Sequence, residues 1–579
     1  MKKHYETHVE DTDKLISVAG PILEYKSWYE QYRKLMEEQA QRKYGLYTPT
    51  SEGDEDDFPS IPGMIARYSA SGLTNEQMKE NPVWVDKTGN GHDLQMKNFA
   101  WKGMSGVGGY EMNFNLCGNN VPHVPDISMS TTTTSVSVSV GNSTYNNNLI
   151  YIHINNWDIN KNHWLKVTST YEDGDLAFFF YKNSNTKKIG LPANGYVNIL
   201  AYPEFKGSYM YIATTFNKQG SFTIEQLPLY PGALVFDGVD DYGICDNFPI
   251  LTKEKGYTVV ALRQYLVDKS TAYLTANGDS ISNTSFIFEG NNYKDTWNFG
   301  RATTIQASRI LATQTSKQYD GVKLNIGSNT EGSNLLQVGK WSKSYSNVAI
   351  WELVFLDHDA TEEELTKIKD YFVKTYPWLF PDQAWTVTGK TNEDEDRATI
   401  ANITGNGNDL VLSNFGFAEG SGYNEEGEYA GYLVTDGVDD KIQSSSFLFG
   451  NDFTVVGEWE FLQEDSNVFA GFNKNYTYFV LYNYISGVNV YVKNDKGTLI
   501  RNAKTLKAVT SEGLVYIDFN SEQKVEIADK VEADLPLYIA YNGNNYTKMA
   551  FKNLAIYPTV LSKDDCIKAY NYLQTLKAK

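Results

Sequence analysis

Short runs of apolar and β-branched residues, separated by Gly, Asn and Asp, fill most of the chain beyond residue 63. Alternation of apolar and polar positions between such turn residues is typical of β-strands. Strands are predicted at Ser135–Val140, Leu149–Ile154, Leu176–Tyr181, Tyr196–Tyr202, Tyr209–Thr214, Tyr257–Leu262, Thr284–Phe288, Asn347–Trp351, Phe453–Glu460, Tyr476–Tyr482 and Val488–Val492. Many short strands joined by turns indicate antiparallel sandwiches or jelly rolls, so the predicted class is mainly β.

Helical spacing is confined to three segments. Between Pro21 and Gly45 the apolar positions form one narrow stripe, which consists of Ile22, Tyr25, Tyr29, Tyr32 and Met36. The other two segments, Thr361–Thr375 and Ser562–Leu576, begin with a hydroxyl residue and carry acids in the first turn, as a helix N-terminus prefers.

The N-terminal helix is followed by a segment, residues 48–62, that contains three prolines and a run of acids. Such a composition buries little apolar surface, and it is typical of a solvated linker. A helix at the end of a linker favours an anchoring or self-association role, with the stripe residues as the contact surface. The alternative is a helix that packs on its own domain.

Three sequence blocks occur twice in the same order. The pairs are TGNGHDLQMKNF and TGNGNDLVLSNF (Thr88–Phe99, Thr404–Phe415), LVFDGVDD and LVTDGVDD (Leu234–Asp241, Leu433–Asp440), and NVAI and NLAI (Asn347–Ile350, Asn553–Ile556). The distance from the second block to the third is 106 residues in one copy and 113 in the other. The chain therefore contains one module twice.

The first copy contains an insertion of domain size. Its first two blocks are 135 residues apart, where those of the second copy are 18 apart. Exposed loops tolerate such insertions, and the inserted segment is itself rich in predicted strands. The predicted organisation is a helix at 1–47, a linker at 48–62, a discontinuous module at 63–117 plus 232–380, an inserted β-sandwich at 118–231 and a second module at 381–579.

The net charge and the composition reduce the number of function classes that fit the chain. A net charge of −20 argues against a nucleic-acid-binding surface, which needs clustered Lys and Arg. Three distant cysteines do not suggest a disulfide framework. Neither a signal peptide nor an apolar run of membrane-spanning length is found. We therefore expect synthesis and folding in a cytoplasm, without membrane insertion.

The repeated blocks resemble the laminin-G-like branch of the concanavalin-A-like jelly rolls. In that family a D-x-S/T-G-N-G-x-x-L block opens the domain, an L-x-F-D-G-x-x-D-Y block follows, and an N-x-x-I-Y…L-S-x-x-E/D block closes it. The first copy matches at Asp86–Leu94, Leu234–Tyr242 and Asn347–Glu364, and the second at Thr404–Leu410, Leu433–Asp440 and Asn553–Asp565. The second copy departs at Asn402, Thr435 and Lys441, which replace Asp, Phe and Tyr. The resemblance implies tandem jelly-roll sandwiches.

The whole chain, with its N-terminal helix, tandem modules and abundant Tyr and Asn, resembles structural proteins of tailed bacteriophages. Head-fibre, tail-fibre and receptor-binding components are the most similar, including those of phages of the crAss-like group. The resemblance implies a non-enzymatic fibre or adhesion protein on the virion surface. Its expected partners are other virion proteins through the N-terminal helix, a second copy of the chain, and host surface glycans. A purely structural adaptor and a glycan hydrolase are the alternatives.

Candidate chemistry is sparse. The twin D-G-V-D-D segments offer oxygen ligands for calcium, with Asp240 and Asp241 as the preferred candidates; a tight turn built by Asp and Gly is the alternative. No other cofactor is expected. Glu458 and Glu460 share one face of a predicted strand but lack the third acid of the glucanase pattern. Aromatic platforms for sugars are suggested by Asn291–Tyr293 and Tyr541–Tyr546.

Overall fold

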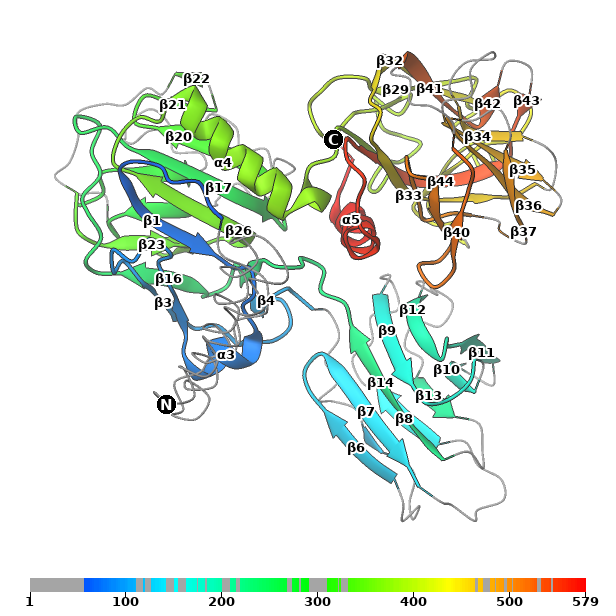
Figure 1. Ribbon diagram of the computed structural model, residues 1–579, viewed down its shortest axis with the longest axis horizontal. Coiled ribbons are helices and arrows are strands. Elements are labelled where there is room, and N and C mark those ends of the chain that lie inside the picture. The colour runs from blue at the N-terminus through cyan, green and yellow to red at the C-terminus, as the bar shows by residue number, and fades with distance from the viewer. Residues whose placement is uncertain are drawn as a thin grey trace, which may run out of the picture. The chain divides into compact units, whose positions relative to one another are not determined.

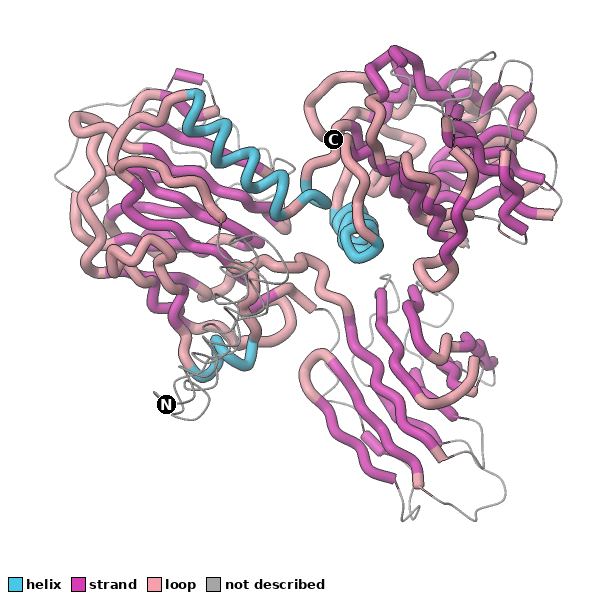
Figure 2. Tube along the Cα trace, viewed as in Figure 1, coloured by secondary structure: helices cyan, strands magenta, loops and turns pink. Residues whose placement is uncertain are grey.

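The structure is a computed structural model, and it divides into two compact units, Met1–Asp57 and Phe58–Lys579. It describes residues 57–110, 118–119, 127–141, 150–154, 163–173, 175–182, 185–199, 209–214, 219–267, 273–280, 283–290, 310–320, 322–323, 332–427, 429–463, 467–471, 479–484, 486–493, 497–501, 503, 505–527, 533–542 and 545–578. The predicted N-terminal helix, with Ile22, Tyr25, Tyr29, Tyr32 and Met36, lies outside these residues. Antiparallel strands dominate the described chain (Figure 2), which confirms the mainly β class.

The first copy forms two antiparallel sheets and a small hairpin. The larger sheet has the order β22-β21-β20-β17-β26-β15-β4, with β1 also paired to β26. Its strands are β1 (Met64–Ser69), β4 (Gly106–Val107), β15 (Leu234–Asp237), β17 (Thr258–Tyr265), β20 (Leu311–Thr315), β21 (Gln318–Tyr319), β22 (Val322–Lys323) and β26 (Asn347–Leu356). The smaller sheet, ordered β19-β18-β23-β16-β3-β2, comprises β2 (Val83–Trp84), β3 (Leu94–Lys97), β16 (Tyr242–Cys245), β18 (Tyr273–Asn277), β19 (Ile287–Gly290) and β23 (Leu336–Val338). The hairpin is β24 (Lys340–Trp341) with β25 (Ser344–Tyr345).

The second copy repeats this plan. One sheet has the order β30-β31-β44-β33-β38-β39-β40, with β27 paired to β44. Its strands are β27 (Gln383–Thr386), β30 (Gly422–Asn424), β31 (Tyr432–Val434), β33 (Thr454–Phe461), β38 (Ala508–Thr510), β39 (Leu514–Tyr516), β40 (Glu522–Lys524) and β44 (Met549–Tyr557). The other sheet runs, in order, through β28 (Thr399–Ile400), β29 (Leu410–Ser413), β32 (Lys441–Phe449), β41 (Ala533–Ile539), β34 (Asn467–Gly471), β35 (Phe479–Tyr484), β36 (Gly487–Val492) and β37 (Thr498–Arg501). The matching hairpin is β42 (Tyr541–Asn542) with β43 (Asn545–Tyr546).

The segment inserted in the first copy forms two five-stranded sheets of its own. The first contains, in order, β11 (Asn185–Gly190), β10 (Leu176–Lys182), β13 (Tyr209–Thr214), β8 (Ile150–Ile154) and β5 (Gly118–Asn119). The second contains β12 (Asn194–Ile199), β9 (His163–Ser169), β14 (Gly220–Gln226), β7 (Ser135–Val140) and β6 (Ile127–Thr131). Among the described residues, none of these strands pairs with a strand of either copy.

Helices are few in the described chain. They are α3 (Asn75–Glu80), α4 (Glu362–Thr375), α5 (Lys563–Thr575) and the 3-10 turn η3 (Pro377–Leu379). Thr361 and Ser562 cap α4 and α5 by accepting hydrogen bonds from the backbone N–H three residues on, which satisfies donors left free at a helix start. Both helices were predicted from these caps. No helix in the described ranges has the length and apolar content that a membrane crossing requires.

In each copy one sheet is buried on both faces because a helix covers its outer side. Val259 and Phe355 belong to the core between the two sheets, whereas Val260 and Val354 pack with Phe372 of α4. Every residue of β17 is therefore buried, and so is every residue of β26 after Asn347, as expected for a strand covered on both faces. In the second copy α5 takes the place of α4 (Figure 1), and its Leu573 packs with Ala555 of β44.

The other sheet of each copy, called here the free sheet, has no helix on its outer face among the described residues. Buried and exposed positions alternate along β3 and along β29, as expected for a sheet with one solvated side. The outer faces of the free sheets therefore expose side chains to solvent along these strands.

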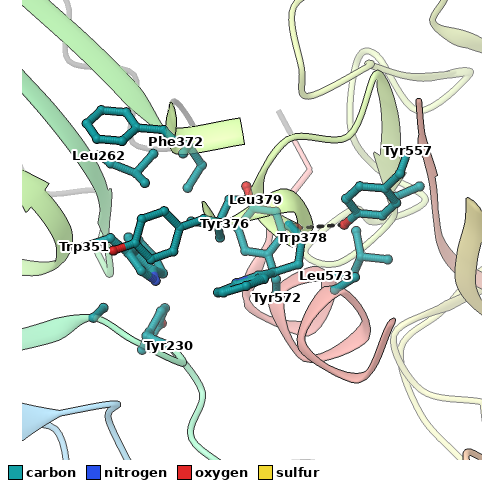
Figure 3. Close-up of a cluster of buried hydrophobic side chains, with 14 of the residues drawn as sticks. Tyr230, Leu262, Trp351, Phe372, Tyr376, Trp378, Leu379, Tyr557, Tyr572 and Leu573 are labelled. Carbon is teal, nitrogen blue, oxygen red and sulfur yellow. Dashed lines mark hydrogen bonds between the residues drawn. The ribbon is translucent and has the colours of Figure 1, made fainter. Parts of the chain in front are cut away.

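The segment between the copies belongs to a large apolar cluster (Figure 3). Tyr376 and Trp378 flank the start of η3 and are buried in it, and the hydroxyl of Tyr557 donates to the carbonyl of Trp378 at 2.9 Å. Phe58 and Ile61 also pack here. Residues 58–62 were predicted to belong to the solvated linker, but their apolar side chains place them in the packed unit.

Candidate functional site

The first D-G-V-D-D segment is a tight turn closed by its own carboxylates. Asp237 accepts hydrogen bonds from the backbone N–H of Val239 at 2.7 Å and of Asp240 at 3.4 Å. Asp241 accepts from the backbone N–H of Asp237 and from the hydroxyl of Ser105, each at 3.0 Å. These bonds account for the first and last aspartates without a bound ion.

The second segment reproduces this turn. Asp436 accepts from the N–H of Val438 at 2.7 Å, and Asp440 accepts from the N–H of Asp436 at 2.7 Å and from Ser421 at 3.0 Å. The glycines at the second position have φ values of 75° and 77°, a conformation that costs glycine little. The same hydrogen bonds thus recur in both copies at a separation of about 200 residues in sequence.

Burial raises the pKa of the last aspartate in each turn. The pKa of Asp241 rises from its ordinary value of 3.8 to about 7, because loss of solvent outweighs the hydrogen bonds from Asp237 and Ser105. The pKa of Asp440 rises to about 6 for the same reason. Carboxylate oxygens of Asp237, Asp240 and Asp241 lie within 4.8 Å of one another. This spacing would allow the three carboxylates to bind one cation, and calcium at Asp240 and Asp241 stays a prediction. The hydrogen bonds directly support the alternative, a tight turn.

Hydrogen bonds in the opening block of each copy explain why Asn402 can stand where the first copy has Asp86. Asp86 accepts hydrogen bonds from the N–H groups of Arg67 and Thr88 and from the hydroxyl of Thr88. Asn402 accepts the corresponding three bonds from Ala384 and Thr404. The oxygen of Asn402 therefore replaces the Asp carboxylate, and its amide donates to Gly407 at 2.6 Å.

A cluster of tyrosines and lysine, called here the Lys–Tyr cluster, lies beside the first turn. Tyr242 directly follows the D-G-V-D-D turn, and Lys340 faces Tyr345 across the β24–β25 hairpin. The ammonium of Lys340 is 4.1 Å from the ring centroid of Tyr242 and 5.2 Å from that of Tyr345. All three side chains are half-buried, so their remaining surface faces solvent.

The second copy has the same cluster with the residue types exchanged. Lys441 occupies the position of Tyr242, and Tyr541 faces Tyr546 across β42–β43, where Lys340 faces Tyr345. The ammonium of Lys441 is 5.0 Å from the Tyr541 ring and 5.9 Å from that of Tyr538. The ammonium has moved from the hairpin to the strand, but it still lies over tyrosine rings.

Sequence reasoning located only part of these clusters. It singled out Tyr541–Tyr546 as an aromatic stretch and Lys441 as a departure, but it did not connect them, and it missed Lys340 and Tyr345. Asn291–Tyr293 lies outside the described residues. The sequence does contain a signal for the clusters. When Lys340–Tyr345 is aligned with Tyr541–Tyr546, Tyr242 and Lys340 of the first copy correspond to Lys441 and Tyr541 of the second, so the two residue types have exchanged positions.

The strand carboxylate Glu458 lies in a buried ionic cluster rather than in an open cleft. Tyr432 donates to it at 2.7 Å, and the ammonium groups of Lys507 and Lys552 are each 3.9 Å away. Burial alone would raise the pKa of Glu458, but these lysines, with Tyr570 of α5 and Tyr432, lower it to about 2. A carboxylate held ionised under a helix cannot act as an acid on an external substrate.

Comparison with known proteins leaves the family undetermined. No family model matches the chain, and no curated protein matches it. Among solved structures it is similar to the botulinum neurotoxin serotype D binding domain (12% identity, 33% of this chain and 50% of that chain, TM-score 0.24). It is also similar to Trypanosoma rangeli sialidase in complex with sialic acid (10%, 78% and 85%, 0.24) and to the binding domain of Paraclostridial Mosquitocidal Protein 1 (12%, 32% and 51%, 0.21). The chain thus spans about half the length of the toxin domains it matches, and at these TM-scores none of the similarities bears on function.

Proposed function

We propose that this chain is a non-enzymatic adhesion component of a tailed-phage virion surface, built from tandem laminin-G-like jelly rolls that bind host glycans. The virion assignment rests on the resemblance of the repeated blocks and of the whole chain to such proteins. The binding role rests on the free sheets, which leave one side of each copy solvated. The anchoring role of residues 1–47 is part of the same proposal.

The observation that carries the binding role is the exchange within the Lys–Tyr clusters. The second copy has a lysine at the position of Tyr242. If these side chains had no role in binding, this replacement would not require a second replacement at the hairpin. Instead, Lys441 is accompanied by Tyr541, and an ammonium lies over tyrosine rings in both copies. Exposed aromatic rings beside polar groups provide the surface on which sugars stack.

Binding is favoured over hydrolysis by the position of the acids. Most glycosidases use two carboxylates that flank the scissile bond in one open cleft. Glu458 is buried in its ionic cluster, and the first and last acids of each turn accept hydrogen bonds from backbone N–H groups. Turnover of a polysaccharide panel by the purified chain would contradict this part of the proposal.

The direct test is binding of the full chain to a glycan array and to host cells, with calcium and with chelator. The proposal predicts retention on cells that a defined sugar competes away. Loss of binding in chelator would assign a role to the aspartate turns. The absence of binding to every glycan and every cell would overturn the adhesion role.

A structural adaptor is the second candidate because each copy exposes an apolar side chain at the same point. Val239 and Val438, at the tips of the two turns, are 70% and 71% exposed. Paired apolar tips suit contact with neighbouring proteins of a particle. Particles assembled with a Val239→Ser/Val438→Ser variant distinguish the roles: reduced incorporation with unchanged glycan binding favours the adaptor.

A further inference from the structure

We propose that each Lys–Tyr cluster is a binding subsite for a carboxylated sugar, a uronic or sialic acid unit of an acidic glycan. This inference rests on the proposed adhesion function and specifies its ligand. The first subsite comprises Tyr242, Lys340 and Tyr345. The second comprises Lys441, Tyr538, Tyr541 and Tyr546.

The two lysines are held in place without being neutralised. Within the described part of the chain, the ammonium of neither Lys340 nor Lys441 forms an ion pair with a carboxylate or a hydrogen bond. Contact with a ring face orients an ammonium while leaving the N–H donors that point away from the ring available. The rings thus position a cation whose donors point to no protein acceptor, which is the arrangement that an anionic ligand requires.

The rings provide the second half of a sugar site. Tyr538 and Tyr541 have ring centroids 5.8 Å apart, and Tyr541 and Tyr546 are 5.2 Å apart, so the second cluster forms a continuous aromatic surface. In the first cluster Tyr242 and Tyr345 are 6.3 Å apart. A pyranose carries an apolar C–H face that packs on such rings, and a carboxylate on the same sugar can pair with the adjacent ammonium.

The charge of the whole chain restricts the ligand further. At a net charge of −20 the protein repels highly charged polyanions at long range. A heavily sulfated chain or a nucleic acid is therefore disfavoured. A glycan with isolated carboxylates meets less repulsion and can still pair locally with Lys340 or Lys441.

Two subsites in one chain favour a polymeric ligand. Single ion pairs at a solvated surface are weak, so one subsite alone would hold a sugar loosely. A surface that displays the same acidic sugar many times allows both subsites to bind at once, and the apparent affinity rises by avidity.

The test uses the full chain and matched probes that differ only in the carboxylate. The first pair is sialyllactose and its methyl ester, and the second is a hyaluronan oligosaccharide and its methyl-esterified form. The proposal predicts that the acidic member of at least one pair binds at least tenfold more tightly than its neutral counterpart. Equal binding of both members in both pairs would overturn it.

The matched variants separate the clusters from general charge. Lys340→Gln/Lys441→Gln should reduce binding of the acidic probe at least tenfold, and each single variant should reduce it less. Lys343→Gln/Lys548→Gln removes two exposed lysines that lie outside the clusters and should leave binding unchanged. Circular dichroism and melting curves confirm that each variant is folded.

The remaining outcomes distinguish this inference from the proposed function. If the double cluster variant binds cells and neutral glycans as the natural chain does, and the acidic probe equally well, the subsite assignment is wrong and the adhesion role stands. If the natural chain binds no glycan and no cell, both proposals fail.

Discussion

The two copies of the module keep one set of backbone contacts while their side chains differ, and the differences occur in matched pairs. A Cβ on Gly339 would lie 2.4 Å from the ring of Phe236. In the second copy Thr435 replaces that Phe, and Ala540 occupies the position of Gly339 with a φ of 61°. The smaller Thr leaves room for the Ala methyl group. A substitution in one copy is thus best understood from its partner in the same copy.

The buried carboxylates offer a second contrast. In the first copy Glu352 on β26 pairs with Arg67 at 3.1 Å and accepts from Tyr376 at 2.8 Å. In the second copy the acid is Glu458 on β33, and two lysines surround it at 3.9 Å. Burial raises the pKa of Glu352 although Arg67 opposes the rise, whereas the lysines lower the pKa of Glu458. Both carboxylates also accept from hydroxyl groups, so the difference lies in the cations: one guanidinium compensates burial less than two ammonium groups do.

Breaking the buried ion pair of the first copy, Arg67–Glu352, should have the largest effect on stability. Arg67→Met leaves Glu352 buried beside tyrosines, and we expect a loss of about 3 kcal/mol in the free energy of unfolding. Lys507→Met should cost less, because Lys552 still compensates the charge of Glu458. Urea unfolding followed by tryptophan fluorescence measures both. Equal losses would contradict the contrast between the copies, and Arg67→Met/Glu352→Gln should recover part of the loss.

Substitutions at Phe236 and Gly339 should have the next largest effect on the free energy of unfolding. Gly339→Ala should cost about 2 kcal/mol, because the new methyl group collides with Phe236. Ala540→Gly should change stability by less than about 1 kcal/mol. In the first copy Phe236→Thr/Gly339→Ala should lose less stability than the sum of its two single variants. Strict additivity in this double-mutant cycle would show that the two positions do not compensate each other.

The opening block predicts a smaller effect. Asn402→Asp replaces the amide that donates to Gly407 with a carboxylate facing that carbonyl oxygen, and we expect a cost of about 1 to 2 kcal/mol. Asp86→Asn removes an acceptor from the N–H of His92, 3.3 Å away, and should cost about 1 kcal/mol. Thermal melting of each variant measures the difference. An unchanged melting temperature for Asn402→Asp would contradict the hydrogen bonding described here.

The two turns should differ in their dependence on pH. The folded chain holds a proton on Asp241 between its ordinary pKa of 3.8 and about 7, while the unfolded chain has released it. Its stabilising contribution is therefore complete below pH 3.8 and is lost as pH rises through about 7. For Asp440 the loss is centred at about 6.

Melting curves of the natural chain and Asp241→Asn at pH 5 and pH 8 test this sign. The melting temperature of the natural chain should exceed that of Asp241→Asn by more at pH 5 than at pH 8. Asp440→Asn should show the same trend, centred at a lower pH. A difference independent of pH would contradict it. A rise in melting temperature on adding calcium at pH 8 would instead support the cation site at Asp240 and Asp241.

Much of the fold was predictable because local signals agreed with tertiary packing. Ser135–Val140 and Tyr209–Thr214 were predicted with the bounds that β7 and β13 have. The segment Thr284–Phe288 was placed too early, since β19 begins at Ile287. Thr284 is β-branched, but its hydroxyl donates to the carbonyl of Ser280 in a turn, so local hydrogen bonding outweighs its strand propensity.

The candidate site was less predictable because its members come from distant segments. Tyr242 and Lys340 are 98 residues apart and meet only through the pairing of β16 with β23 and the hairpin that follows β23. The aspartates were found early because they are adjacent in sequence. Their burial, which raises the pKa of Asp241 and Asp440, depends on packing that sequence does not display.

Hydrogen–deuterium exchange of the full chain, with and without the best-binding glycan, locates the ligand most directly. We predict slower exchange in peptides covering residues 336–347 and 536–547, the two hairpins with their neighbouring strands, and unchanged exchange in α4 and α5. Protection confined to the helix-covered sheets, or to the inserted domain, would contradict the assignment of binding to the Lys–Tyr clusters.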